Sequence, residues 1–183
     1  MNVGTLKMEP ALLRRDLLAP SVAGALEAKD GGLSPDEVLV AEIDPDLADT
    51  AAFCERYAVG LEQSANCVIL AARREGRAWF AACVVLATTK ADVNGIAKRQ
   101  LGAGKISFAA MDAAVGASGM EYGGITPLGL PADWPILIDE AVVAAKGVIV
   151  GSGLRRSKIW LPGRALAQLP NAAVLASLGR GGP

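Results

Sequence analysis

The segment 119–131, Gly-Met-Glu-Tyr-Gly-Gly-Ile-Thr-Pro-Leu-Gly-Leu-Pro, constrains the fold of this chain more than any other stretch. Its glycine and proline content predicts a rigid loop and argues against a helix or a central strand. Gly123 and Gly124 can take positive φ and allow close approach, whereas Pro127 and Pro131 fix φ and remove amide donors. Consecutive amides in such a loop can form an oxyanion hole. A tight structural turn is the alternative interpretation.

The apolar segments on either side of this loop predict an α/β or α+β domain with a mixed, curved sheet and helices outside it. Strands are expected at 38–43, 67–72, 78–87, 105–108, 135–138, 148–150 and 158–161. Helices are expected at 46–57, 88–101, 109–118 and 163–169, with Asp46 and either Thr88 or Thr89 as N-caps. The segment 78–87 is apolar on both faces, which predicts that it lies in the middle of the sheet.

The two ends of the chain are expected to differ from its middle. Apolar residues in 6–29 recur every three to four positions, which predicts two short helices separated at Pro20 and ended by Gly31 or Gly32. Packing of this region on the domain is favoured over a contact helix for a partner. The expected division is an N-terminal helical extension at 1–33, the main domain at 34–178 and a disordered tail at 179–183.

The chain has no histidine, and this absence excludes several classes of site. Its three cysteines, Cys54, Cys67 and Cys83, form no Cys-x-x-Cys motif. The common zinc frameworks and the Ser-His and Cys-His nucleophile pairs are therefore excluded. We expect no metal and no cofactor, and we interpret the cysteines as buried thiols in a reducing compartment.

Charge and hydropathy limit the partners of the chain. A net charge of −1 argues against broad binding to nucleic acid, although a local basic patch could still contact the end of an RNA. The longest apolar run, 78–87, is about half of the ~20 residues that a membrane-spanning helix needs. We therefore expect a cytoplasmic protein without a membrane partner.

Three motifs in order carry a resemblance to a known family: Gly123–Pro127 followed by Gly129, the apolar segment 135–139 ending in Asp139, and Val148–Gly153 ending in Gly-Ser-Gly. Together they resemble the signature of the YbaK/ProX family of aminoacyl-tRNA editing domains, over roughly residue 34 onward. The resemblance implies a sheet wrapped toward a barrel and hydrolysis of the ester in a mischarged aminoacyl-tRNA. The implied partner is the tRNA acceptor end, with an aminoacyl-tRNA synthetase as a further candidate.

The resemblance also implies a set of site residues. The catalytic candidates are Gly123, Gly124 and Ile125, as amide donors to an oxyanion or carbonyl, and Asp139, which could orient a water or equally serve as an N-cap. The candidates for substrate binding are Asn66, Thr126, Pro127, Ser152 and Gly153. Arg155, Arg156 and Lys158 are candidates for contacts with tRNA phosphates, and a charged surface turn is the alternative.

The chain departs from the family at Asn66, where most editing members carry a lysine. Asparagine can donate a hydrogen bond to a carbonyl or phosphate but supplies no charge. Two interpretations therefore stay open: a trans-editing aminoacyl-tRNA deacylase, and a binding module of the same fold that has little or no activity.

Overall fold

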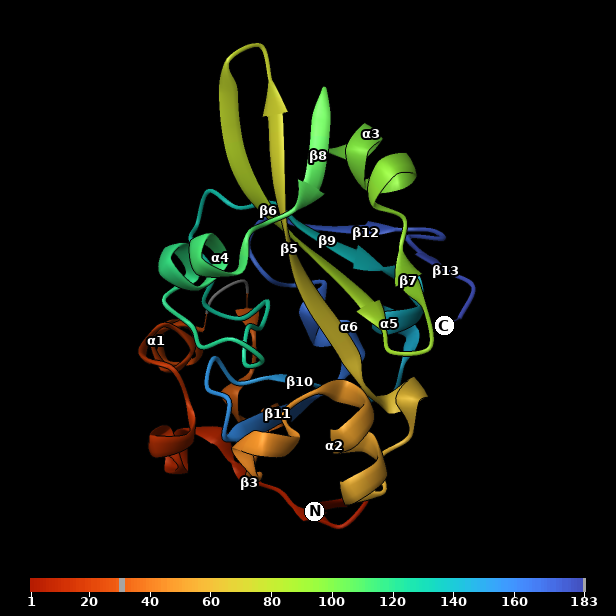
Figure 1. Ribbon diagram of the computed structural model, residues 1–183. Helices are drawn as coiled ribbons and strands as arrows, with labels where there is room; N and C mark the ends of the chain where they lie inside the picture. The colour runs from red at the N-terminus through yellow and green to blue at the C-terminus, as the bar shows by residue number, and fades with distance from the viewer. Residues whose placement is uncertain (30–31, 183) are drawn as a thin grey trace.

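The computed structural model describes residues 1–29 and 32–182, and it contains two main sheets (Figure 1). The larger sheet has the spatial order β12 (Ala172–Leu175), β9 (Ile136–Asp139), β6 (Arg77–Leu86), β5 (Ala65–Arg74) and β8 (Lys105–Phe108). The smaller sheet has the order β10 (Val148–Gly151), β11 (Ser157–Leu161), β4 (Leu39–Glu42) and β3 (Glu9–Pro10). An isolated bridge between Ser64 and Ile149 joins the two sheets next to the start of β5.

The larger sheet confirms the expected mixed topology. β6 pairs antiparallel with β5 and parallel with β9, so it is the central strand, as its apolar faces predict. β5 and β6 form a long hairpin whose two turn residues, Glu75 and Gly76, have φ values of 50° and 79°. Positive φ at both positions is characteristic of the type I′ turn, whose twist matches that of the flanking strands. The tip of this hairpin projects beyond the rest of the molecule (Figure 1).

In the described residues, six short α-helices surround the sheets, which agrees with the expected class of fold. They are α1 (Pro20–Ala28), α2 (Thr50–Tyr57), α3 (Lys98–Gln100), α4 (Met111–Ser118), α5 (Glu140–Ala144) and α6 (Gly163–Leu166). The largest apolar cluster lies between these helices and the sheets, and it includes Leu26, Ile138 and Ile159, none of which is exposed.

Two helices begin later than the sequence predicts. The Asp44 side chain accepts a hydrogen bond from the Asp46 amide (2.9 Å) and caps a separate 3-10 turn, Pro45–Leu47. α2 therefore starts after Asp49 and not at Asp46. The expected helix at 88–101 is likewise replaced at its start by the short strand β7 (Lys90–Ala91).

Asp92, not Thr88 or Thr89, caps the helical segment that follows β7. Its carboxylate accepts hydrogen bonds from the amides of Gly95 (3.1 Å) and Ile96 (3.0 Å). This cap starts a π-helical turn, Val93–Ala97, that leads into α3.

The N-terminal region packs on the domain, as expected, but only its second half is an α-helix. Before α1 the chain forms β1 (Asn2–Val3), β2 (Leu6–Lys7), β3 and the 3-10 turns Ala11–Leu13 and Arg15–Leu17. Pro20 begins α1 instead of separating two helices, because a proline at the first helical position lacks only an amide that would have no partner there. α1 ends at Ala28, and Lys29, with φ of 53°, caps it instead of the predicted Gly32, while Gly31 lies outside the described residues.

The chain end 179–182 is more ordered than the disordered tail that the sequence predicts. β13 (Gly179–Arg180) pairs antiparallel with β7. The Gly179 amide donates to Asp139 Oδ2 (2.6 Å), and Arg180 forms an ion pair with Asp92 (2.8 Å). These long-range contacts fix a segment whose composition alone indicates disorder, while Pro183 lies outside the described residues.

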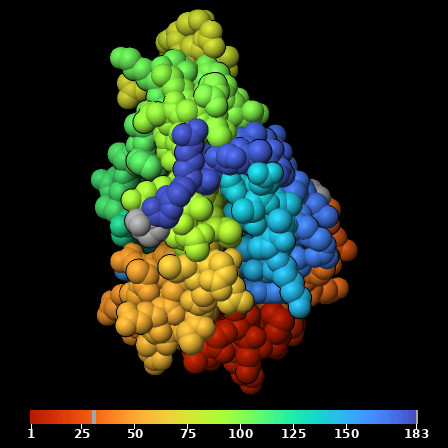
Figure 2. Space-filling view, turned by 90° about the vertical axis from the view of Figure 1, so that its right-hand side faces the viewer, coloured from red at the N-terminus to blue at the C-terminus, as the bar shows by residue number. Residues whose placement is uncertain are grey.

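Within residues 1–29 and 32–182, none of the helices has the length and apolar character that a membrane crossing requires. The space-filling view shows the hairpin at one end of an elongated molecule and the N-terminal strands at the opposite end (Figure 2).

Candidate functional site

The loop 119–131 has no helix or strand and is attached to the segment after β10, which confirms its predicted irregular structure. Gly119 ends α4 with φ of 68°. The Glu121 amide donates to the Gly153 carbonyl (2.9 Å), and the Gly153 amide donates to the Gly124 carbonyl (2.7 Å). These two hydrogen bonds hold the first half of the loop against the end of the smaller sheet.

The two adjacent glycines of the loop are needed for different reasons. Gly123 has φ of 80°, a conformation that residues with a Cβ rarely adopt. A Cβ on Gly124 would lie only 2.5 Å from the backbone carbon of Leu154, so this position requires glycine for close backbone approach. The sequence predicts positive φ for either residue, and the structure assigns it to Gly123.

A cavity of about 280 Å³ lies beside this loop, at the junction of the two sheets. Its wall combines the loop with the start of α2, the first half of β5, β10 and β11. The residues that line it are Ala48, Asp49, Thr50, Ser64–Val68, Tyr122, Gly123, Ile125, Ile149–Gly151 and Lys158. The volume is close to the lower end of the range for small-molecule sites, so the cavity matches a group about as large as one amino acid.

Lys158 provides a buried cation in this cavity. Only 7% of the residue is exposed, and its Nζ donates hydrogen bonds to the carbonyls of Ala48 (2.9 Å) and Gly123 (3.5 Å). Burial lowers the pKa of Lys158 from 10.5 to about 8, while the Coulombic effect of Asp49 opposes that shift. The ammonium group therefore stays mostly protonated at neutral pH, in surroundings where a charge interacts strongly.

The position of Lys158 follows from the alternation of β11. Ile159 belongs to the main core, whereas Trp160 packs against a second apolar cluster beneath α2. Lys158 shares the face of Trp160, and its Nζ lies 5.4 Å from the ring centroid of Phe53 in α2. The sequence places Lys158 with Arg155 and Arg156 in a basic surface cluster, but the structure separates it from them.

Asn66, a substrate-binding candidate from the resemblance, lines the cavity. Thr50 Oγ1 donates to Asn66 Oδ1 (2.6 Å), so the carbonyl end of this amide is already occupied. The nitrogen of Asn66 remains as a donor toward a ligand. Thr50 was not predicted from the sequence, and it orients Asn66 from the first turn of α2.

The amides of Gly123, Gly124 and Ile125 differ in whether they donate a hydrogen bond within the protein. The Gly124 amide donates to the Glu121 carbonyl (2.9 Å). Across the described ranges 1–29 and 32–182, the amides of Gly123 and Ile125 donate to no protein group, and both residues line the cavity. These two amides are therefore the donors that a ligand oxygen could meet.

Asp139 is not among the residues that line the cavity. It is 5% exposed and caps α5, where Oδ1 accepts from the Ala141 amide (2.9 Å). Oδ2 accepts from Gly179, as described above. Both carboxylate oxygens thus hold backbone amides, which matches the N-cap interpretation of this residue.

Ser152, Gly153, Thr126 and Pro127 also lie outside the cavity lining. Ser152 is fully buried, and its hydroxyl lies 2.7 Å from the hydroxyl of Ser157, which in turn donates to the Leu17 carbonyl (2.7 Å). This chain of hydroxyls ties the N-terminal region to the smaller sheet. Thr126, within the loop, is fully buried.

The two arginines expected to bind phosphates are engaged within the chain. The Arg155 amide donates to Glu121 Oε2 (2.6 Å), and its guanidinium lies 5.7 Å from the ring centroid of Tyr122. The guanidinium of Arg156 donates to the Asp16 carbonyl. Both arginines brace the loop and the N-terminal region.

Cys67 is a neutral thiol in the wall of the cavity. Burial raises the pKa of Cys67 above its ordinary value, so little thiolate forms at neutral pH. Because the thiolate is the nucleophilic form, Cys67 acts as a small apolar wall residue.

The sequence was compared with known families and structures. The aminoacyl-tRNA editing domain family matches residues 44–169, which make up more than half of the chain. The protein therefore belongs to this family, and the resemblance inferred from the motifs is confirmed. No curated protein matches the sequence.

Two solved structures share the fold. One is a proposed trans-editing enzyme for prolyl tRNA synthetase, with a TM-score of 0.73, 21% identity, and coverage of 90% of this chain and 99% of that one. The other is a hypothetical protein with a TM-score of 0.73, 19% identity, and coverage of 87% and 99%. At these identities the likeness establishes the fold.

Proposed function

We propose that this protein is a trans-editing deacylase that hydrolyses the ester between an amino acid and the terminal ribose of a mischarged tRNA. The observation that carries the proposal is the buried ammonium of Lys158, which lies beside Gly123 in a cavity of amino-acid size. Membership of the editing family supports the choice of substrate. The proposed place of action is the cytoplasm.

In the proposed reaction, water attacks the ester carbonyl carbon and releases a proton to solvent, and the carbonyl oxygen becomes an oxyanion. The amides of Gly123 and Ile125 and the ammonium of Lys158 are the donors that stabilise this charge. Preorganised donors in a site sheltered from water have large effects on such reactions. The bond to the ribose oxygen then breaks, and that oxygen takes a proton from solvent as the free amino acid leaves.

Asp49 is the only carboxylate among the cavity-lining residues of the described chain. Because it lies at the exposed start of α2, its carboxylate is the group that binds the α-ammonium of the aminoacyl ester in this proposal. Asn66, held by Thr50, donates to the ester or to the terminal ribose. The small volume of the cavity and the apolar side chains of Ala65, Ile125 and Ile149 favour a small apolar side chain on the bound amino acid.

A deacylation assay over a panel of mischarged tRNAs tests this function. The panel includes tRNAs charged with small apolar amino acids and tRNAs charged with large aromatic ones, and spontaneous hydrolysis is subtracted from each rate. We expect turnover confined to the small amino acids. Absence of turnover over the whole panel would overturn the proposal.

A binding module of the same fold remains the second candidate, because Asn66 is neutral where the resembled family has a lysine. Such a module would protect or present an aminoacyl end without hydrolysing it. It predicts saturable binding of a non-hydrolysable aminoacyl-adenosine amide together with no deacylation. The two functions therefore require the same ligand, but the deacylase hydrolyses it and the binding module does not.

A further inference from the structure

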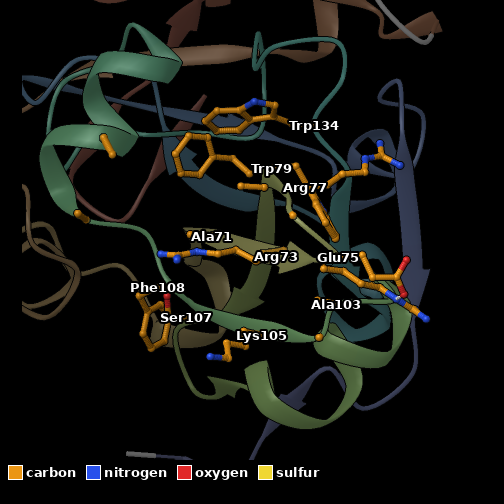
Figure 3. Close-up of a pocket in the computed structure, with 18 of the residues that line it drawn as sticks. Ala71, Arg73, Glu75, Arg77, Trp79, Ala103, Lys105, Ser107, Phe108 and Trp134 are labelled. Carbon is orange, nitrogen blue, oxygen red and sulfur yellow. Dashed lines mark hydrogen bonds and ion pairs between the residues drawn. The ribbon is translucent and has the colours of Figure 1, made fainter.

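A second and larger hollow, of about 1430 Å³, lies at the other end of β5. It is formed by the distal part of the β5–β6 hairpin, by β8 and by the start of α4. We call it the hairpin groove and define it by Arg73, Arg77, Trp79, Lys105, Phe108 and Trp134. Figure 3 shows Trp134 at one end, Phe108 and Lys105 at the opposite end, and Arg73 between them.

The hairpin groove is locally basic although the chain as a whole has a net charge of −1. Four cations and two carboxylates line it, the carboxylates being Glu75 and Asp133. Glu75 is already paired with Arg74 (3.2 Å). Across residues 1–29 and 32–182, the side chains of Arg73, Arg77 and Lys105 form no ion pair, and all three residues are exposed.

Two of these cations, Arg73 and Lys105, lie close together because of strand pairing, whereas Arg77 is opposite Arg74 at the tip of the hairpin. Arg73 is directly opposite Lys105 of β8 in the antiparallel ladder, and the two side chains therefore share one face of the sheet. Like charges in this position destabilise a sheet. An anionic partner that binds across both side chains would remove that repulsion.

Exposed aromatic surface accompanies the charge. Phe108 is 63% exposed, which is unusual for a large apolar residue in a strand. Trp134 is buried and packs on Phe80, with ring centroids 5.1 Å apart, so it forms a firm wall. An exposed aromatic ring at the edge of a cationic surface can stack on an RNA base while the cations bind phosphates.

We infer that the hairpin groove binds RNA, with Arg73 and Lys105 on phosphates along one face of the sheet, Arg77 on a phosphate near the tip of the hairpin, and Phe108 stacked on a base. This rests on the proposed function in one respect: the RNA is the tRNA whose aminoacyl end enters the cavity. Asn66 and Arg73 are seven residues apart on β5, or about 23 Å at ~3.3 Å per residue. A ligand that reaches both sites must extend beyond an aminoacyl nucleotide, as a tRNA does.

Uncharged, fluorescently labelled tRNA is the probe for this inference, since its binding requires no hydrolysis. The triple variant Arg73→Gln, Arg77→Gln, Lys105→Gln should weaken binding at least about tenfold. Its plot of log affinity against log salt should be shallower by about 2, from ~0.7 per phosphate contact on single-stranded RNA. Phe108→Ser should weaken binding on the order of tenfold without changing that slope.

Matched controls separate the groove from general effects of charge and exposure. The charge control is Lys7→Gln, Arg99→Gln, Lys146→Gln, which removes three exposed cations outside the groove. The apolar control is Leu13→Ser, at a residue that is 78% exposed. We expect both controls to keep wild-type affinity and melting temperature.

Unchanged tRNA affinity and salt slope in the triple groove variant would overturn the inference, as would a wild-type protein that does not bind tRNA. If the same variant instead lost binding to a synthetase, the groove would be a protein-binding surface. Hydrolysis of a short 3′-aminoacyl trinucleotide is a separate readout. It tests the proposed function alone, and the groove variants should hydrolyse this substrate at the wild-type rate.

Discussion

The two ends of β5 present cations in opposite environments. At the first end, the cavity is lined by the ammonium of Lys158, which is 7% exposed and has a pKa lowered to about 8. At the other end, Arg73, Arg77 and Lys105 are exposed around an open groove. A buried charge acts strongly over a short range, whereas exposed charges are screened by salt and attract polyanions.

This difference suggests a division of roles along one strand. The cavity is small, and its donors are fixed by backbone contacts, which suits transition-state stabilisation. The groove is wide, and its long, exposed side chains can reach phosphates at different positions, which suits RNA binding. Changes at the two ends should therefore affect different measurements.

Replacement of Lys158 should give the largest effect. Lys158→Met removes the cation but keeps an unbranched apolar stem, and we expect deacylation to fall about 10²- to 10³-fold, as when an oxyanion donor is lost. The melting temperature should change little, because an apolar residue no longer carries the cost of burying a charge. Turnover on tRNA and melting temperature are the two measurements.

The matched control for Lys158 is Lys146→Met, an exposed lysine between α5 and β10. It should keep full activity. A Lys158→Met protein that loses stability but retains its activity per folded molecule would make Lys158 structural and would remove the proposed contrast between the two ends.

Gly124→Ala should have the next largest effect. The new Cβ would lie 2.5 Å from the Leu154 carbonyl carbon, so the loop or the segment after β10 must shift. We expect a loss of about 1–3 kcal/mol in the free energy of unfolding. Deacylation by the remaining folded protein should also fall, because the aimed amides move.

Gly76→Ala, at the groove end of the hairpin, is the control for Gly124. Gly76 has φ of 79°, but nothing lies within 4 Å of the position of its Cβ. This change should cost only the strain of positive φ, about 1 kcal/mol, and should leave hydrolysis of the short ester intact. Equal losses of that activity in both variants would contradict the assignment of the loop to the site.

The pH dependence should follow Lys158. Burial is the largest effect and lowers the pKa of Lys158, the Coulombic effects of Asp49 and Cys54 raise it, and that of Arg155 lowers it, which sets the value at about 8. Enzymatic deacylation should decline as the pH rises through about 8, after subtraction of base-catalysed hydrolysis. The decline should approach tenfold per pH unit above that value, and it should be absent in Lys158→Met.

Stability should show the opposite trend in the same region of pH. Between about 8 and 10.5 the unfolded chain keeps the Lys158 proton that the folded protein has released. The free energy of unfolding should therefore rise with pH through this window relative to Lys158→Met, by up to about 3 kcal/mol. A constant difference between the two proteins would show that Lys158 keeps an ordinary pKa.

Moving the cation of the cavity from position 158 to position 66 should give the smallest effect. Asn66→Lys added to Lys158→Met should recover about tenfold of the lost deacylation, because both positions line the same cavity. Lys105→Met, at the groove end, is the comparison: adding Asn66→Lys to it should not restore tRNA affinity. No recovery in the first pair would mean that the position of the ammonium, and not only its charge, is essential.

The sequence by itself determined the loop, most strands and the family. Gly123 and Gly124 predict an irregular segment, and the continuous apolar run at 78–87 predicts a central strand, because turn chemistry and side-chain periodicity act over a few residues. The ordered motifs from Gly123 to Gly153 identified the editing domain before its geometry was known. The resemblance implied Asn66 as a substrate-binding residue, and Asn66 lines the cavity.

The tertiary structure decided which polar residues meet. Lys158 looks like part of a basic surface cluster in the sequence, yet pairing of β11 with β10 and β4 directs it into the cavity. Asp139 looks available at a strand end, yet Gly179, forty residues later, occupies one of its oxygens. Both outcomes depend on pairings between distant segments, and no local pattern encodes which face of a strand such pairings will bury.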